Sequence, residues 1–118
     1  MSATRMKPRV KTYWLSALRS GEFIQGRSRL RSEDKKQHCC LGVLTALYLR
    51  EHPEDTNTAD QLNRGSTLSQ AVMDWAELFR TNPPVQSLVN ANYRTNLGSL
   101  NDDGADFAEI AQVIEEQL

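Results

Sequence analysis

The sequence has little cysteine and no long apolar run. Its two cysteines, Cys39 and Cys40, are adjacent in the 118-residue chain. Adjacent cysteines provide no disulfide framework, because a bond between neighbours strains the backbone, and we therefore expect a reducing compartment, the cytoplasm. No apolar stretch approaches the roughly 20 residues that span a bilayer. No apolar segment follows the basic start of the chain, so we expect neither a membrane span nor a secretory leader.

Motifs for several chemistries are also missing. The chain has no phosphate-binding glycine loop, no nucleophile elbow and no His-Glu-x-x-His zinc motif. Zinc needs four ligands, and three of the candidates would be the consecutive residues 38–40, which cannot easily face one ion. The acidic turn 101–106 lacks the bidentate glutamate that completes a calcium-binding EF-hand loop. We therefore expect no metal, no cofactor and no catalytic residue.

The net charge of −1 conceals an uneven distribution of charge along the chain. Residues 1–36 carry ten basic and three acidic side chains, whereas residues 37–118 carry four basic and twelve acidic ones. Either the two regions neutralise each other within one domain, or the basic region binds an anionic partner such as nucleic acid or an acidic protein. The sequence leaves both interpretations open.

The length predicts one globular domain over residues 1–118, with residues 1–7 expected to be flexible. The pattern favours the α+β class, with about four helices and a short antiparallel β-hairpin or small sheet. Apolar stripes and capping residues predict helices over residues 8–18, 39–50 and 107–118, the last capped by Asp106. A further helix is expected to start at a cap of Thr67 or Ser69 and to run to Phe79, which would lie on its apolar face. Trp14 is expected to anchor the core. Gly42 lies within the most apolar helix, which suggests that another backbone approaches it closely.

The connecting segments carry the candidate binding residues. Strand-forming residues and alternating polar and apolar residues flank a Gly-Arg-Ser turn within residues 22–31, and this pattern predicts the hairpin. The outer side of the hairpin would carry Arg27, Arg29 and Arg31. These arginines form either a solvated face or a contact surface. Residues 53–66 contain almost no apolar side chain and are expected to form a long surface loop. A short strand over 85–89, irregular chain over 90–96 and a turn over 100–104 are also expected.

The two cysteines allow a second interpretation. A helix N-terminus lowers the pKa of a thiol and makes it more nucleophilic. A thiol nucleophile also needs a base, and His52 would lie at the far end of the same helix, roughly 18 Å away. His38 is the other histidine of the chain, and free cysteine is among the most buried residue types. Core packing is therefore the preferred role of Cys39 and Cys40.

Three segments carry a resemblance to a known group of proteins. They are Trp14-x-x-Ala17-Leu18-Arg19-Ser20-Gly21-x-Phe23-x-Gln25, then Cys39-Cys40-Leu41-Gly42-Val43-Leu44, and Leu100-Asn101-Asp102-x-Gly104-x-x-Phe107-x-x-Ile110-Ala111. They resemble a family of small uncharacterised proteins from tailed phages and bacterial prophages, over nearly the whole chain. His38 replaces the aromatic residue expected before the cysteines, and residues 53–65 have no counterpart. The resemblance implies a phage-encoded accessory protein in the host cytoplasm and brings no established activity.

We therefore expect a non-enzymatic protein that binds and inhibits a host protein, with antiviral defence as the process opposed. One alternative is a sponge for a nucleotide second messenger, in which the arginines bind phosphates. Another is a thiol-dependent hydrolase or transferase that uses Cys39 or Cys40. Nucleotide or nucleic acid could bind the basic N-terminal third, a homo-oligomer is compatible with the sequence, and no membrane partner is expected.

Overall fold

The first helix begins at Pro8, as predicted, and continues to Ser20, beyond the predicted end at Leu18. In the computed structural model, which describes residues 6–86 and 94–118, α1 spans Pro8–Ser20. Proline suits the first helical position, because its missing N–H would have no partner there. Gly21 ends the helix with a φ of 79°, a left-handed conformation that glycine adopts without strain.

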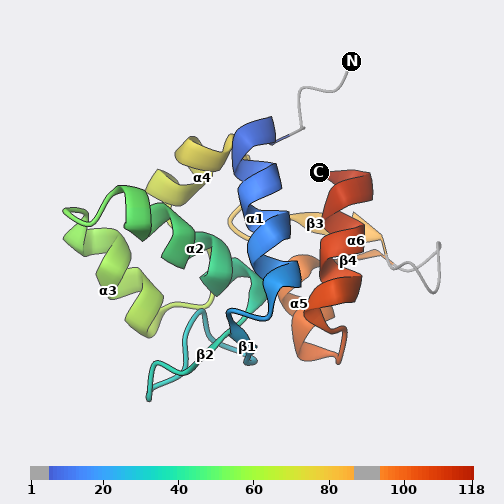
Figure 1. Ribbon diagram of the computed structural model, residues 1–118, viewed down its shortest axis with the longest axis horizontal. Coiled ribbons are helices and arrows are strands. Elements are labelled where there is room, and N and C mark those ends of the chain that lie inside the picture. The colour runs from blue at the N-terminus through green and yellow to red at the C-terminus, as the bar shows by residue number, and fades with distance from the viewer. Residues whose placement is uncertain (1–5, 87–93) are drawn as a thin grey trace.

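Six helices and two small sheets make up the described part of the chain, so the expected α+β class is confirmed with more helices than expected (Figure 1). After α1 the elements are β1 (Ile24–Gln25), β2 (Gln37–His38), α2 (Cys40–Glu51), α3 (Thr56–Arg64), α4 (Gln70–Ala76), β3 (Pro84–Gln86), β4 (Arg94–Asn96), α5 (Leu97–Asp102) and α6 (Phe107–Gln117).

Helix α2 forms the centre of the core. It contacts α1, α3, α4 and α5, and eight of its twelve residues are buried. Trp14 of α1 is fully buried and donates its indole N–H to the carbonyl oxygen of Cys40 at 3.0 Å. Its expected role as a core anchor is confirmed. Helix α6 packs beside α1 on the other side (Figure 1).

Gly42 is where another backbone meets α2. A Cβ atom at this position would lie 1.7 Å from the carbonyl oxygen of Leu30, so only glycine fits. The carbonyl of Leu30 accepts the N–H of Cys39 at 3.1 Å, and the Leu30 side chain is fully buried. The close approach expected from the sequence is confirmed.

The predicted hairpin over residues 22–31 is wrong. Strand β1 pairs in parallel with β2, with Ile24 opposite Gln37 and Gln25 opposite His38. The second half of the expected hairpin does not pair with the first half. The N–H of Leu30 donates instead to the carbonyl of Gly65 at 3.0 Å. Burial of Leu30 in the core therefore outweighs local strand pairing, and the antiparallel sheet is formed by β3 and β4 instead.

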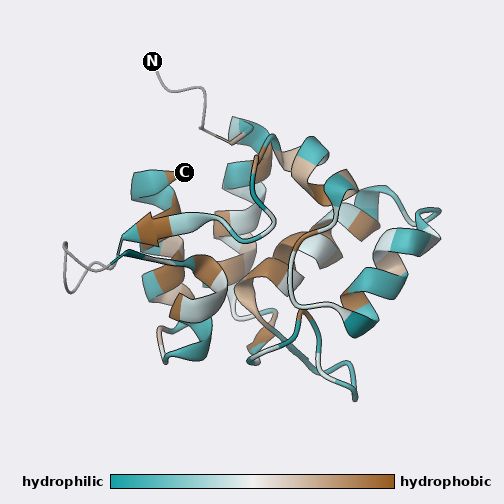
Figure 2. Ribbon diagram, turned by 180° about the vertical axis from the view of Figure 1, so that it is seen from behind, coloured by the Kyte–Doolittle hydropathy of each residue, from teal (hydrophilic) through white to brown (hydrophobic). Residues whose placement is uncertain are grey.

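The long loop expected over residues 53–66 is also wrong, because helix α3 occupies most of it. Asp55 caps this helix by accepting the N–H of Thr58 at 3.0 Å. Leu62 and Thr58 are its buried residues, which explains why the segment shows almost no apolar periodicity. Figure 2 shows α3 as a mainly hydrophilic helix at the edge of the molecule.

Helix α4 ends earlier than expected. Ser69 caps its start, as predicted, but Glu77 takes a left-handed conformation with a φ of 58° and ends the helix after Ala76. Phe79 was expected on the apolar face of this helix. Its side chain is instead 69% exposed, because the helix ends at Glu77 and Phe79 no longer lies on its apolar face, whereas the neighbouring Leu78 is buried.

The C-terminal third is predicted in part, because strand β4 occupies the end of the irregular chain that was expected over 90–96. Asp106 caps α6 by accepting the N–H of Glu109 at 2.9 Å, as the capping pattern predicts. Helix α5 replaces the first part of the turn expected over 100–104. Strand β3 confirms the first two residues of the strand expected over 85–89, whereas 87–93 lie outside the described residues.

The start of the described chain is fixed to the domain. Met6 is buried and donates its N–H to Leu118, and the N–H of Lys7 donates to Ala76 at 2.8 Å. Residues 1–5 lie outside the described part, so the expectation that residues 1–7 are flexible stays a prediction. Within residues 6–86 and 94–118, no helix combines the length and the apolar character needed to cross a bilayer.

Candidate functional site

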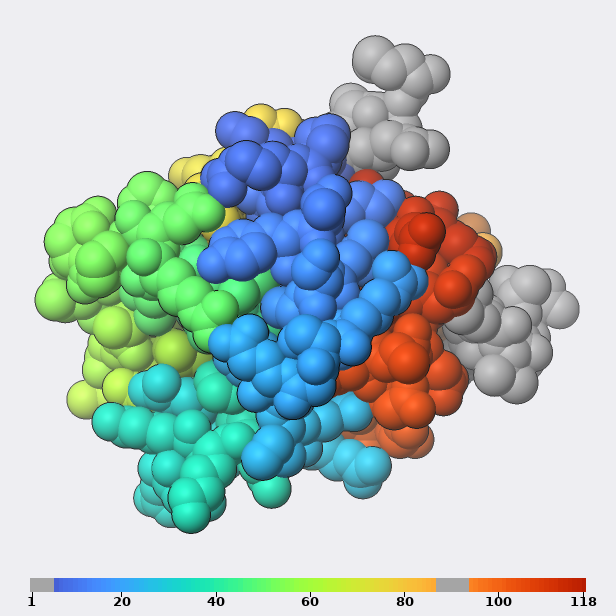
Figure 3. Space-filling model, viewed as in Figure 1, coloured from blue at the N-terminus to red at the C-terminus, as the bar shows by residue number. Residues whose placement is uncertain are grey.

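The candidate binding residues lie on one projecting segment, which we call the basic loop, residues 27–36. It connects β1 to β2 and stands out from the lower edge of the molecule (Figure 3). It carries five basic side chains against two acidic ones. The basic residues are Arg27, Arg29, Arg31, Lys35 and Lys36.

Two of the three predicted arginines attach the loop to α3. Arg29 donates to the backbone carbonyl of Asn63 at 2.6 Å, and Arg31 donates to the side-chain oxygen of the same residue. Asn63 lies in the last turn of α3, where the helix dipole favours positive charge. Arg27 is exposed. The structure therefore distinguishes an exposed arginine from two that hold the loop in place.

The tip of the loop is a turn fixed by hydrogen bonds. The carboxylate of Asp34 accepts the hydroxyl of Ser32 at 2.5 Å and the N–H of Lys36 at 3.0 Å. The hydroxyl oxygen of Ser32 in turn accepts the N–H of Gln37 at 3.0 Å. The bond from Ser32, followed by that from Lys36, lowers the pKa of Asp34 below its ordinary value, so the carboxylate stays ionised at neutral pH. Lys35 and Lys36 are thus presented on a defined turn.

The positive charges of α1 are used within the domain. Arg9 pairs with Glu51 at 2.9 Å, and Arg19 pairs with Glu115 at 2.5 Å. Lys11 also donates to the backbone carbonyl of Glu115 at 3.0 Å. In the described residues, no basic side chain of the loop forms an ion pair within 4.0 Å. Internal neutralisation therefore accounts for α1 but not for the basic loop.

Both thiols lie in the interior, as the preferred interpretation predicts. Cys40 is fully buried and donates its S–H to the carbonyl of Leu97 at 3.6 Å. Cys39 is 4% exposed, and its sulfur accepts the N–H of Gly42 at 3.4 Å as the cap of α2. Burial raises the pKa of both thiols, that of Cys40 most strongly, so both are protonated at neutral pH.

Cys39 nevertheless borders a small polar cavity of about 170 Å³. The residues that line it are Ser28, Cys39, Ser66, Thr67, Asn82, Gly98, Ser99 and Asp102. The nearby Asp102 carboxylate contributes to raising the pKa of the Cys39 thiol, because its negative charge disfavours a thiolate. The ring of His38 packs edge-on against Phe23 at 5.0 Å, and His52 caps the opposite end of α2. The arrangement does not favour thiol catalysis.

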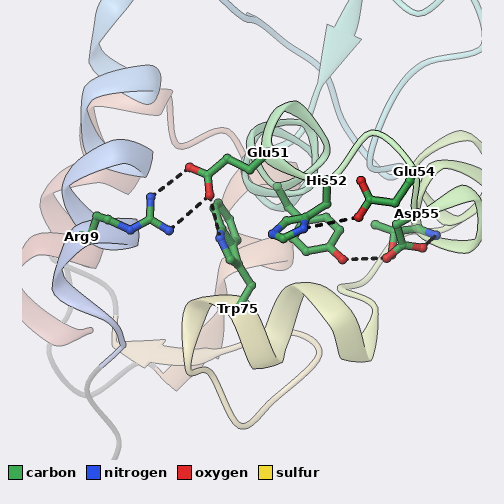
Figure 4. A network of polar contacts seen from close by, with 8 residues as sticks. Arg9, Glu51, His52, Glu54, Asp55 and Trp75 are labelled. Atoms are coloured by element: carbon green, nitrogen blue, oxygen red, sulfur yellow. Dashed lines mark hydrogen bonds and ion pairs between the residues drawn. The ribbon is translucent and has the colours of Figure 1, made fainter.

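A second polar network joins α1, α2 and α4 (Figure 4). Glu51 accepts both η nitrogens of Arg9, at 2.9 and 3.2 Å, and the indole N–H of Trp75 at 3.2 Å. The hydrogen bond from Arg9 is the main reason why the pKa of Glu51 lies below its ordinary value. A carboxylate held in this way is a poor proton acceptor, so the network serves to connect the three helices.

The same network continues to the start of α3. The hydroxyl of Tyr48 donates to Asp55 at 2.7 Å, and burial together with this carboxylate raises the pKa of Tyr48 to about 12. The ring of His52 stacks on that of Tyr48 at 4.6 Å and lies 3.6 Å from the carboxylate of Glu54. Tyr48 is therefore a structural hydrogen-bond donor at neutral pH, and it positions the residue that caps α3.

The motifs that carry the resemblance meet at Asn101, which is fully buried. Its side-chain oxygen accepts from Gln25 at 2.9 Å and from the N–H of Cys40 at 3.3 Å. Its side-chain nitrogen donates to the carbonyl of Gly26 at 2.8 Å. Asp102 next to it accepts the N–H of Ser28 at 2.8 Å. The conspicuous Cys-Cys and Leu-Asn-Asp segments therefore hold the base of the basic loop against α2 and α5.

The model of one protein family, described as a domain of unknown function (DUF8296), matches residues 6–118. The chain belongs to the DUF8296 family. Comparisons with curated proteins and with solved structures found no match. The matched span of the DUF8296 domain includes every residue that the structure describes, so the basic loop and both thiols belong to it.

The thiols of this DUF8296 domain are expected to be unreactive in the native state. Because both sulfurs are buried and protonated, Ellman's reagent should label them at least about a hundredfold more slowly than in urea. The measurement is the absorbance change with time, and the variants Cys39→Ser and Cys40→Ser assign each phase. Rapid labelling of Cys39 in the native state would show that reagents reach this thiol through the polar cavity. Such a result would support the alternative of a thiol-dependent enzyme.

Proposed function

We propose that this protein is a phage-encoded accessory protein that acts in the cytoplasm of the host cell. It binds and inhibits a host protein, with a component of antiviral defence as the expected class. The resemblance of its Cys-Cys and Leu-Asn-Asp segments supports the phage origin. The observation that carries the binding role is the basic loop, whose positive charges project from the domain on a fixed backbone.

The rigidity of the loop supports this role. A contact segment that is already ordered loses less conformational entropy on binding than a mobile one. Ser28 and Lys35 have φ values of 70° and 65°, a left-handed conformation that costs energy for residues other than glycine. Such strain persists because the surrounding hydrogen bonds fix it, and it is often found at binding sites.

We propose different tasks for the residues of this surface. Arg27, Lys35 and Lys36 are exposed and are proposed to face an acidic surface of the partner. Arg29 and Arg31 are proposed to keep the loop in position through Asn63. Ile24, which is 61% exposed at the base of the loop, adds apolar contact area.

A nucleotide ligand has less support than a protein partner. The hollow at the tip of the loop is lined by Ser32, Glu33, Asp34 and Gln37. Its two carboxylates would repel phosphate groups, and the hydrogen bonds of Arg29 and Arg31 to Asn63 compete with phosphate binding. A broad acidic protein surface can contact the separate charges of the loop without entering this hollow.

Charge reversal at the loop tip tests the proposal. The immobilised protein should retain a host protein from lysate, and the double variant Lys35→Glu, Lys36→Glu should bind that purified protein at least about tenfold more weakly. The matched control is Arg19→Glu, Arg64→Glu, which changes the net charge equally at two exposed residues of α1 and α3, outside the basic loop, whose exposed ion pairs contribute little to stability. This control should bind like the wild type.

Three results would contradict the proposal. The first is an equal affinity of the loop variant and the control for the retained protein. The second is retention of the same set of lysate proteins by the wild type and the loop variant. The third is release of an intact nucleotide from the heated protein with no host protein retained, which would favour the sponge.

A further inference from the structure

The outer edge of β3 is closed by a side chain instead of a strand. Strand β3 pairs with β4 through Val85 opposite Thr95 and Gln86 opposite Arg94. The N–H of Leu97 donates to the carbonyl of Pro83 at 3.0 Å. Polar groups alternate along an antiparallel ladder, so the N–H and carbonyl of Gln86 point away from β4.

Gln117 occupies the place that a third strand would take. Its side-chain nitrogen donates to the carbonyl of Gln86 at 2.8 Å, and its side-chain oxygen accepts the N–H of Gln86 at 2.8 Å. A primary amide presents an N–H donor and a carbonyl acceptor side by side, and here it uses one of each, as a residue of a neighbouring strand does. Gln117 lies in the last turn of α6 and is exposed, so its side chain can swing away without disturbing the core.

Gln117 borders two hollows. One, of about 250 Å³, is bordered by Phe79, Pro83, Pro84 and Leu118, and it also contacts Arg80. The other, of about 230 Å³, is bordered by β3 and β4. The first is largely apolar, and the exposed ring of Phe79 forms part of its wall. Side chains on alternate residues of an extended peptide could enter the two hollows.

The charge around the edge indicates what could bind there. Arg80 borders the first hollow and Arg94 the second. Among the described residues, no aspartate or glutamate lines either hollow. Pro84 has no N–H to donate, which keeps the edge short and discourages extended sheet formation between proteins. The site therefore fits a short, acidic peptide segment and not a long strand.

We propose that the outer edge of β3 binds an extended peptide segment of a partner protein. Gln117 swings aside, and the peptide backbone pairs with Gln86. An apolar side chain of the peptide fills the hollow at Phe79, and an acidic one pairs with Arg80 or Arg94. This mode, in which a peptide adds a strand to a sheet edge, is independent of the basic loop.

A library of short random peptides displayed on ribosomes tests the proposal. Selection on the wild-type protein should enrich peptides that carry an apolar residue close to an acidic one. A selected peptide should bind Phe79→Ala at least about tenfold more weakly, because the exposed ring is a wall of the hollow. Phe79 is 69% exposed, so this variant should keep its fold.

Gln117→Ala supplies the decisive comparison. This variant should bind the selected peptide about threefold to tenfold more tightly, because no internal hydrogen bonds have to be broken first. Gln112→Ala is the matched control, since Gln112 is an exposed glutamine of the same helix that bonds to Glu116. In nuclear magnetic resonance spectra, the side-chain amide of Gln117 should shift on addition of peptide to the wild type.

The proposal is overturned if no peptide motif is enriched, or if the selected peptides bind Phe79→Ala and Gln117→Ala like the wild type. It is also overturned if the wild type self-associates in sedimentation experiments and Phe79→Ala abolishes this, because the edge would then be a dimer interface. The variant Lys35→Glu, Lys36→Glu should bind the peptide like the wild type. Failure of the peptide site and failure of the basic loop are therefore distinguishable.

Discussion

Replacing Gly42 with alanine is expected to lower the free energy of unfolding by about 4 kcal/mol or to prevent folding. The new Cβ atom would lie 1.7 Å from the carbonyl oxygen of Leu30. In a helix without this contact, the same change would stabilise by about 1 kcal/mol. The contact with Leu30 thus turns a stabilising substitution into a destabilising one. Urea denaturation followed by circular dichroism measures the change in the free energy of unfolding.

The backbone of Leu30 has little freedom to move away from an alanine. Its carbonyl accepts from Cys39, its N–H donates to Gly65, and its side chain is fully buried. Gly21→Ala is a suitable control, because no atom lies within 4 Å of the new Cβ and the φ of 79° accounts for the whole effect. We expect it to cost about 1 kcal/mol. Unchanged stability of Gly42→Ala would mean that the segment carrying Leu30 can be displaced from α2.

The helices with a clear apolar stripe were predictable from sequence. α1, α2 and α6 each bury residues at helical spacing, and α1 and α6 also begin at a proline or a capping aspartate. The close contact at Gly42 was predictable too, since glycine is unfavourable within a helix unless space is short. In these regions local sequence and tertiary packing favour the same structure, which is why the prediction succeeds.

Elements that depend on distant partners were not predictable in the same way. Strand β1 pairs with residues more than ten positions along the chain, in parallel, so no turn between adjacent strands could reveal it. Helix α3 buries little besides Leu62 and Thr58, and its capping residue, Asp55, was the one local signal available. A polar helix of this kind is stabilised by packing at a few points and by its cap, which periodicity does not detect.

The candidate sites show the same division. The sequence predicted Arg27, Arg29 and Arg31 on the outer side of a hairpin, whereas the structure has them on the connection from β1 to β2. The attachment of Arg29 and Arg31 to Asn63 depends on α3, which was not foreseen. The side chain of Gln117 bonds to the backbone of Gln86, which lies far from it in the sequence. No sequence pattern predicts a hydrogen bond of this kind.

Replacing Asn101 with leucine is expected to lower the free energy of unfolding by about 4 kcal/mol. Leucine has a similar volume but cannot hydrogen-bond. The N–H of Cys40 and the carbonyl of Gly26 would lose the Asn101 partner, and the first of them lies in the buried core. Thermal unfolding should show a correspondingly lower midpoint. Asn57→Ala, at an exposed position of α3, should stay within about 0.5 kcal/mol of the wild type.

A double-mutant cycle separates the network from simple packing. Gln25 donates to Asn101 at 2.9 Å and also to the carbonyl of Ala105 at 2.7 Å. If the two side chains act as one hydrogen-bonded unit, Gln25→Ala should cost less in the Asn101→Leu background than in the wild type, by about 1 kcal/mol. Additive effects would mean that the Asn101 side chain acts only through its hydrogen bonds to the backbone of Cys40 and Gly26. Coupling would show that Asn101 joins β1 to α2, and with them the base of the basic loop.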